Sequence, residues 1–179
     1  MLYTSTRDNS LKVTSAEAVT SGISKEGGLF VPCEVPEADL DFINSMVNDS
    51  YKQRAKKILS LYLTDFTPDV VSSFVEGAYA DGKFSSEDIA PVVNLHDNVN
   101  ILELWKGPTC AFKDMALQLL PHLLTGAAKK TLDNKEIVIL VATSGDTGKA
   151  ALEGFCDVEK TKILVFYPNN GVSPMQKLQ

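Results

Sequence analysis

The chain has 179 residues, of which 44% are hydrophobic and 22% charged, a composition typical of an ordinary globular protein. Its net charge of −6 at pH 7 argues against a general nucleic-acid-binding protein, because such proteins carry basic patches for phosphates. No apolar run approaches the roughly 20 residues that a membrane-spanning helix needs. The three cysteines show no metal-ligand spacing, which predicts reduced thiols packed as small apolar side chains, no metal site and a cytoplasmic protein.

The N-terminal part, residues 1–84, predicts a mostly helical segment with short strands. Residues 1–6 are one expected strand, and the apolar stretch 27–32 between breakers is another. A short helix is expected over Ser15–Ser21, with Ser15 as a candidate N-cap and the glycine after it as a stop signal.

A longer helical region is predicted from residue 37 to residue 79, because apolar residues recur there at helical spacing. These residues are Leu40, Ile43, Val47, Ala55, Ile58, Leu59 and Leu63. A separate helix is expected to start at Pro68 with Thr67 as its N-cap, since proline suits the first helical turn. The glycine-containing break at 80–84 is the expected boundary with the second part, residues 85–179.

Strands and helices alternate in that second part. Two short strands, 91–98 and 100–105, are expected on either side of a polar turn. A helix is predicted over residues 112–130, with an interruption near Leu120 because Pro121 lacks a backbone donor.

Two further apolar runs, 137–142 and 162–167, predict parallel strands joined by a helix and a right-handed crossover. Neither run alternates between apolar and polar residues, which is typical of a sheet that is covered on both faces. The predicted fold class is therefore α/β with a parallel sheet. Two strands and one crossover do not complete such a sheet, so we expect the N-terminal piece of a longer, truncated protein.

Between these strands lies a glycine-rich turn, residues 143–148, which reads TSGDTG. A P-loop needs four residues between its glycines and a hydroxyl residue after its lysine. Here two residues separate Gly145 from Gly148, and Ala150 follows Lys149, so the P-loop interpretation fails. Backbone amides at the start of the next helix would still attract a small anion such as a carboxylate. A tight, capped strand-to-helix turn explains the pattern equally well.

A second informative segment, residues 107–118, reads GPTCAFKDMALQ. Lys113 lies there between Phe112 and Met115, beside the apolar stripe of the predicted helix. Partial desolvation would favour the uncharged amine that Schiff-base chemistry requires. The alternative is a surface lysine whose stem covers apolar neighbours. Thr109 could line a cavity or simply stabilise a turn.

These two segments together resemble threonine synthase, a family of pyridoxal-phosphate (PLP) enzymes of fold type II. The resemblance rests on PTCAFKDMALQ followed further along by ATSGDTG. It extends to YTSTR near the start, to EAVTSGISKEGGLFVP, and to YPNNGVSPMQKLQ near the end. It implies part of a fold-type-II parallel-sheet enzyme with a helical N-terminal segment.

The resemblance also implies roles for individual residues. Lys113, with Phe112 beside it, would bind PLP through a Schiff base. Asp146 would lie next to the phenolic oxygen of the cofactor, where many relatives have Asn, so either this carboxyl group or that oxygen would carry a proton. The turn would hold the α-carboxylate of the substrate, and its candidate ligands are Thr143, Ser144, Gly145, Thr147 and Gly148.

A third resemblance lies at Ser5, Thr6 and Arg7, which match an N-terminal signature of the family. A link to the substrate phosphate and a role at the edge of a sheet both stay open for them.

The implied reaction converts O-phospho-L-homoserine and water to L-threonine and phosphate, with Lys113 as the carrier of protons. The implied partner is this small molecule, without nucleic acid or membrane. The cradle for the cofactor phosphate is absent from the 179 residues, so we expect weak or no PLP binding and no turnover by the chain alone. Two alternatives are another fold-type-II lyase, such as a threonine or serine dehydratase, and a non-catalytic fragment of the fold.

Overall fold

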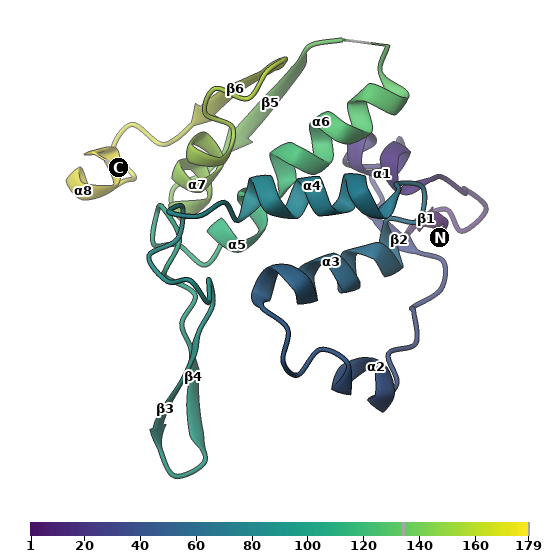
Figure 1. Cartoon of the computed structure of the whole chain (residues 1–179). Coiled ribbons are helices and arrows are strands. Elements are labelled where there is room, and N and C mark those ends of the chain that lie inside the picture. The colour runs from purple at the N-terminus through teal and green to yellow at the C-terminus, as the bar shows by residue number, and fades with distance from the viewer. Residues whose placement is uncertain (134, 179) are drawn as a thin grey trace. The chain divides into compact units, whose positions relative to one another are not determined.

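The structure is a computed structural model that describes residues 1–133 and 135–178, and it divides into two compact units. The first unit comprises Met1–Gly77 and Leu123–Asn134, and the second comprises Ala78–His122 and Lys135–Gln179. The sequence-based division differs in keeping residues 123–134 with the C-terminal part. The helices and strands of the chain are labelled in Figure 1.

The first unit begins with a small antiparallel sheet and a short helix. Strands β1 (Tyr3–Ser5) and β2 (Phe30–Pro32) pair, with Thr4 opposite Val31. Helix α1 spans Ser15–Ser21 as predicted, but its N-cap is Thr14 and the prediction of Ser15 was wrong. The Thr14 hydroxyl accepts the Glu17 N–H at 3.3 Å, and the Glu17 carboxylate accepts the Thr14 N–H at 2.7 Å. This reciprocal capping box places the N-cap one residue earlier than predicted.

Three helices occupy the helical region predicted over residues 37–79. They are α2 (Leu40–Asn44), α3 (Tyr51–Tyr62) and α4 (Pro68–Ala78). The predicted start of a helix at Pro68 is confirmed, and the Val71 N–H donates to the Thr67 carbonyl at 3.0 Å. The apolar positions of α2 are not core, since Leu40 and Ile43 are exposed.

The core of the first unit forms where α4 meets α6 (Leu120–Thr131). Val71, Val75 and Ala127 are almost completely buried there. Gly126 lies so close to the Phe74 ring that an added Cβ would overlap it. This tight packing explains why residues 123–134 belong to the first unit although they lie far along the chain.

A partly buried carboxylate, Asp65, joins three segments of the first unit. It accepts hydrogen bonds from the Ser15 hydroxyl and from the Ala16 N–H at 3.2 Å, and Lys130 lies 3.4 Å away. The Lys130 ammonium also lies 4.4 Å from the centroid of the Phe66 ring. Burial raises the pKa of Asp65, but these hydrogen bonds and the Lys130 charge outweigh it and hold the pKa below its ordinary value of 3.8.

Stability should therefore fall in acid as Asp65 takes up a proton. Its folded-state pKa is depressed, so its contribution is fully present above the unfolded-state value and is lost as pH falls through the folded-state value, below 3.8. We expect Asp65→Asn to lower the free energy of unfolding at pH 7 by about 1–3 kcal/mol. The difference from wild type should shrink at pH 3, as measured by urea unfolding. The exposed Asp133→Asn is the control, because asparagine tolerates its left-handed φ of 42°. An undiminished difference at pH 3 would contradict this expectation.

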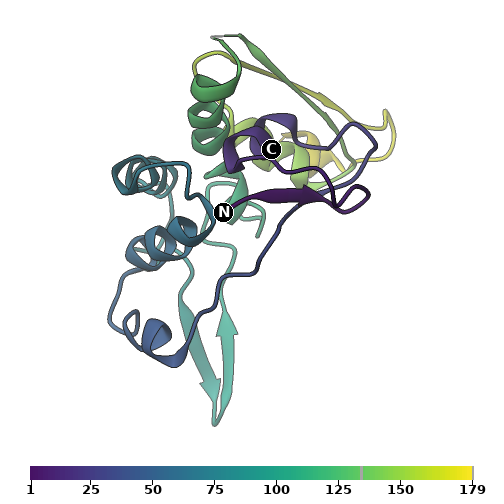
Figure 2. The ribbon, with the colours of Figure 1, turned by 90° about the vertical axis from the view of Figure 1, so that its right-hand side faces the viewer.

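The second unit carries an exposed β-hairpin. Strands β3 (Val92–His96) and β4 (Val99–Leu102) pair antiparallel, which confirms the two predicted strands around a turn. Every residue of both strands is exposed. The hairpin extends away from the other elements of its unit in both views (Figures 1 and 2).

The predicted parallel strand–helix–strand unit is also confirmed. Strands β5 (Ile137–Ala142) and β6 (Thr161–Phe166) pair in parallel and α7 (Asp146–Gly154) connects them. The prediction that both sheet faces are covered is wrong for the described residues, because burial alternates along both strands. Four apolar side chains on one face are 51–66% exposed, namely Val138, Leu140, Leu164 and Phe166.

The remaining helices of this unit are short. Helix α5 (Asp114–Leu117) is separated from α6 by two residues, which confirms the predicted interruption near Leu120. Helix α8 (Pro174–Leu178) follows β6. Within the described ranges, 1–133 and 135–178, no helix combines the length and the apolar character required to span a bilayer.

Candidate active site

The turn between β5 and α7 presents backbone amides at a helix start. Gly145 occupies the N-cap position, and among the described residues no side chain caps this helix. The Gly145 N–H instead donates to the Thr143 hydroxyl at 3.2 Å. The Gly148 N–H donates to the Gly145 carbonyl at 3.2 Å. The Asp146 and Thr147 amides at this uncapped start lack helical acceptors, which leaves them as the donors for an anion. This geometry favours the anion-binding interpretation of TSGDTG over a capped turn.

The two glycines of this turn have different reasons to be glycine. A Cβ on Gly148 would lie 2.6 Å from Thr143 Cγ2 and 3.0 Å from Val165 Cγ1. Gly148 therefore lets α7 approach the end of β5 and the covered face of β6. A Cβ on Gly145 would meet nothing within 4 Å.

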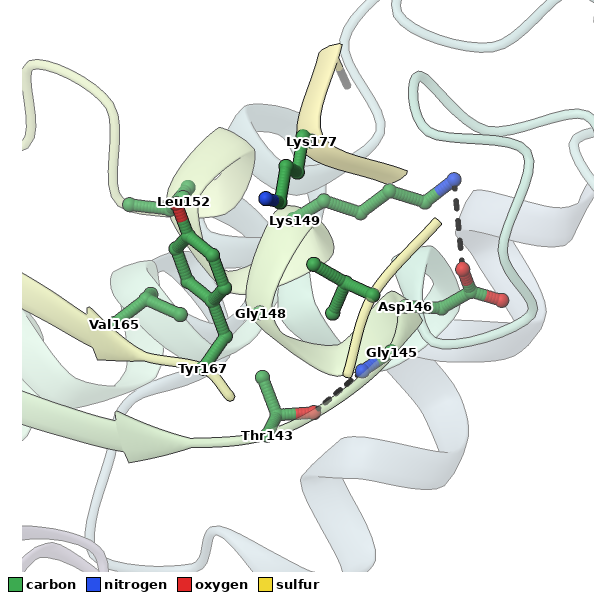
Figure 3. Close-up of a pocket in the computed structure, with 10 residues that line it drawn as sticks. Thr143, Gly145, Asp146, Gly148, Lys149, Leu152, Val165, Tyr167 and Lys177 are labelled. Atoms are coloured by element: carbon green, nitrogen blue, oxygen red, sulfur yellow. Dashed lines mark hydrogen bonds and ion pairs between the residues drawn. The ribbon is translucent and has the colours of Figure 1, made fainter. Parts of the chain in front are cut away.

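The turn borders a cavity of ≈ 250 Å³ (Figure 3). Four predicted site residues line it, namely Thr143, Gly145, Asp146 and Gly148. The predicted Ser144 and Thr147 are not among its described lining residues. Six lining residues were not predicted as site residues: Lys149, Leu152, Val165, Tyr167, Val172 and Lys177.

This cavity carries charges of both signs with an excess of ammonium groups. Lys149 Nζ lies 3.6 Å from Asp146 Oδ1, and the Lys149 side chain is only 13% exposed. Figure 3 shows this ion pair at the first turn of α7, with Lys177 approaching the same space from the segment after β6. Two ammonium groups and free helix amides suit an anionic ligand. Tyr167 was predictable in principle, because the carboxyl ends of parallel strands meet at one edge.

Lys113 lies on a separate segment of the same unit. It immediately precedes α5, which starts at Asp114 and not at residue 112 as expected. Lys113 is half-buried, and its Nζ lies 5.0 Å from the centroid of the Phe112 ring. Phe112 itself is 62% exposed. Neither residue is among the described lining residues of the cavity beside the turn.

A second cavity, of ≈ 470 Å³, lies between residues 108–110, which precede Lys113 in the sequence, and residues of and after α7. Pro108, Thr109 and Cys110 line it from one side, and Lys149 and Leu152 border both cavities. The segment that leads to Lys113 and the helix that follows the glycine-rich turn therefore face a common space. Thr109 lines this cavity, and its hydroxyl donates to Asp114 at 2.6 Å, which supports the interpretation as a turn hydroxyl. A role for Thr109 beside the cofactor stays a prediction.

The N-terminal signature makes contacts at the edge of the small sheet. The Thr6 hydroxyl accepts the Leu29 N–H at 3.0 Å, and Arg7 donates to the Glu26 carbonyl at 3.1 Å. Ser5 is fully buried and donates to the Glu26 carboxylate. These contacts support the sheet-edge interpretation, and a link to a substrate phosphate stays a prediction.

The cysteines and the possible metal ligands were also considered in the sequence-based predictions. All three cysteines are free, as predicted, but all are exposed, so their prediction as packed apolar side chains was wrong. In the described part of the chain, no three His, Cys, Asp or Glu side chains are grouped to hold a metal ion.

Comparison with known proteins identifies the family. Residues 2–79 match the family model described as threonine synthase N terminus. Threonine synthase of Schizosaccharomyces pombe is 34% identical over 185 residues, which cover 99% of this chain and 36% of that protein. Threonine synthase of Escherichia coli K12 is 37% identical over 172 residues, covering 96% of this chain and 38% of the relative. The chain thus spans little more than a third of the length of these relatives.

A solved structure agrees along almost the whole chain. The crystal structure of PLP-bound threonine synthase from Brucella melitensis superposes with a TM-score of 0.89 at 34% identity. The match covers 98% of this chain and 37% of that structure. The parallel-sheet fold is therefore that of fold-type-II enzymes, with a mainly helical N-terminal segment. Along almost its whole length, the chain is thus similar in sequence and fold to the N-terminal portion of threonine synthases.

Proposed function

We propose that this chain supplies the lysine and the substrate-carboxylate turn of a PLP-dependent threonine synthase. The substrate would be O-phospho-L-homoserine, and the products would be L-threonine and phosphate. The observation that carries the proposal is the uncapped start of α7 at Gly145, which leaves amide donors beside a cavity bordered by two ammonium groups.

The residues present fit part of a PLP site. Lys113 offers a primary amine that is half-buried at the start of α5. PLP, when bound, supplies an electron sink for chemistry at the carbons of an amino acid. Phe112 and Asp146 are the other proposed cofactor contacts. The Asp146 carboxyl group pairs with Lys149 and would lie next to the phenolic oxygen of the cofactor.

Two sets of groups in this chain would bind the substrate and transfer its protons. The amides and hydroxyls of Thr143, Ser144, Gly145, Thr147 and Gly148 would bind the α-carboxylate and orient the amino acid. Lys113 Nζ would remove and return protons at the α- and β-carbons. Fixing the carboxylate at the start of a helix would set which carbon faces that nitrogen.

The test joins this chain to the remaining portion of the E. coli relative and assays the products. We expect phosphate and L-threonine in equal amounts from O-phospho-L-homoserine when PLP is present. Ammonia and a keto acid would indicate a dehydratase instead and would contradict the proposed reaction. The same chimera with Lys113→Ala is the control, because it retains the carboxylate turn but lacks the amine.

A further inference from the structure

Asp114 is a fully buried carboxyl group next to Lys113 in the sequence. Its relative exposure is 0%, and both of its oxygens accept hydrogen bonds from Thr109. The Thr109 N–H lies 2.8 Å from Oδ2, and the Thr109 hydroxyl lies 2.6 Å from Oδ1. Burying a carboxylate is costly unless it is hydrogen-bonded, so this group organises the segment that surrounds it.

The segment before Lys113 is folded closely around that carboxylate. A Cβ on Gly107 would lie 2.5 Å from both Cβ and Oδ2 of Asp114, so the backbone touches the acid there. Cys110 adopts a left-handed φ of 58°, which is unfavourable for a residue with a side chain. Its N–H donates to the Gly107 carbonyl at 3.1 Å, which closes a turn. Such strain persists only where neighbouring contacts hold the backbone in place.

Lys113 is fixed from the other side by helix α5. Its carbonyl accepts the Ala116 N–H at 3.1 Å and the Leu117 N–H at 2.8 Å. The Asp114 N–H in turn donates to the Ala111 carbonyl at 2.9 Å. The direction of the Lys113 side chain thus depends on the turn at 107–111 and on α5. Asp114 connects the two, because it is the first residue of α5 and its side chain is bonded to Thr109 in the turn.

We propose that Asp114 is a positioning residue for Lys113. Through Thr109 it anchors the turn that precedes the lysine, and this anchoring sets the direction in which the amine leaves the backbone. The same anchored residues, Pro108, Thr109 and Cys110, form one wall of the ≈ 470 Å³ cavity, so the anchor also shapes the space in front of α7. The inference rests on the proposed function of Lys113 as the amine that binds PLP.

The test measures where PLP reacts on the chain. The chimera of this chain with the remaining portion of the E. coli relative is incubated with PLP, reduced with borohydride and digested. The share of adduct at each lysine of residues 1–179 is then determined by mass spectrometry. We expect Asp114→Ala to lower the share at Lys113 about three- to tenfold, because the amine is no longer correctly oriented and loses its advantage over other lysines. Asp114→Asn should restore it to within about twofold, since the amide can still bond both Thr109 groups. The exposed Asp88→Ala is the matched control.

A second variant guards against an unfolded Asp114→Ala protein. Thr109→Val keeps the carboxylate and removes one of its two hydrogen bonds, and circular dichroism establishes that each variant is folded. Hydrogen exchange of the Thr109 amide should speed up in Asp114→Ala and not in Asp88→Ala. An unchanged Lys113 share in folded Asp114→Ala and Thr109→Val proteins overturns the positioning role. No preference for Lys113 in the unsubstituted chimera overturns the proposed function itself, and with it this inference.

Discussion

Replacing Lys113 with arginine is expected to remove the borohydride-stable PLP adduct from residues 1–179 of the chimera with the E. coli relative. Arginine keeps the charge over the Phe112 ring, 5.0 Å away in the native protein, but its guanidinium does not condense with an aldehyde. The amine at the start of α5 is half-buried and preceded by an anchored turn, so it should hold most of the label on residues 1–179 of the chimera. We expect total labelling to fall at least about tenfold, because scattered surface lysines lack a bound aldehyde.

The control for this experiment is Lys149→Arg. Lys149 borders both cavities and is only 13% exposed, so it is the most informative competing amine. Its arginine variant retains the ion pair with Asp146 and should leave labelling at residue 113 unchanged. If Lys149→Arg removed the adduct while Lys113→Arg did not, the assigned lysine would be wrong. The measurement is mass spectrometry of the intact and digested protein.

The second large effect is expected at Gly148. Alanine there would place a methyl group 2.6 Å from Thr143 Cγ2 and 3.0 Å from Val165 Cγ1, so strand ends and helix must move apart. Overpacking of this kind costs about 1–3 kcal/mol in the free energy of unfolding. The displaced turn should also lose affinity for carboxylate ligands, because its amides no longer converge.

Gly145→Ala is the matched control in the same turn. A methyl group there meets nothing within 4 Å, and the φ of −154° is accessible to any residue. The weaker N-cap and the less flexible unfolded chain have opposing effects of about 1 kcal/mol each, so the net change should be small. Chemical denaturation of both variants gives the comparison. Equal destabilisation by the two alanines would contradict the packing role assigned to Gly148.

Much of the fold was predictable because local signals agreed with tertiary packing. Pro68 marked a helix start, Pro121 marked an interruption, and two uninterrupted apolar runs marked parallel strands. The wrong N-cap shows a signal that was present but not used. Ser15 and Thr14 are both capping residues, and only Glu17, three positions after Thr14, distinguishes them.

The coverage of the sheet could not be predicted in the same way. An apolar run specifies that a strand tolerates burial on both faces, but it does not specify which element covers each face. Likewise, Lys177 reaches the cavity because of the path that the chain takes after β6, and no local pattern marks that path. Thr143, Gly145 and Gly148 were predictable because the turn itself fixes their positions.

The apolar sheet face formed by Val138, Leu140, Leu164 and Phe166 has a consequence for the behaviour of the chain in solution. Uncharged runs of β-branched and aliphatic residues at an open sheet edge are templates for aggregation with other copies. Mutual repulsion from a net charge of −6 at pH 7 opposes such clustering, and it vanishes near the isoelectric point of about 4.9. Colloidal stability of this protein is thus controlled by its carboxylates, and mildly acidic buffers should precipitate it while its fold is still intact.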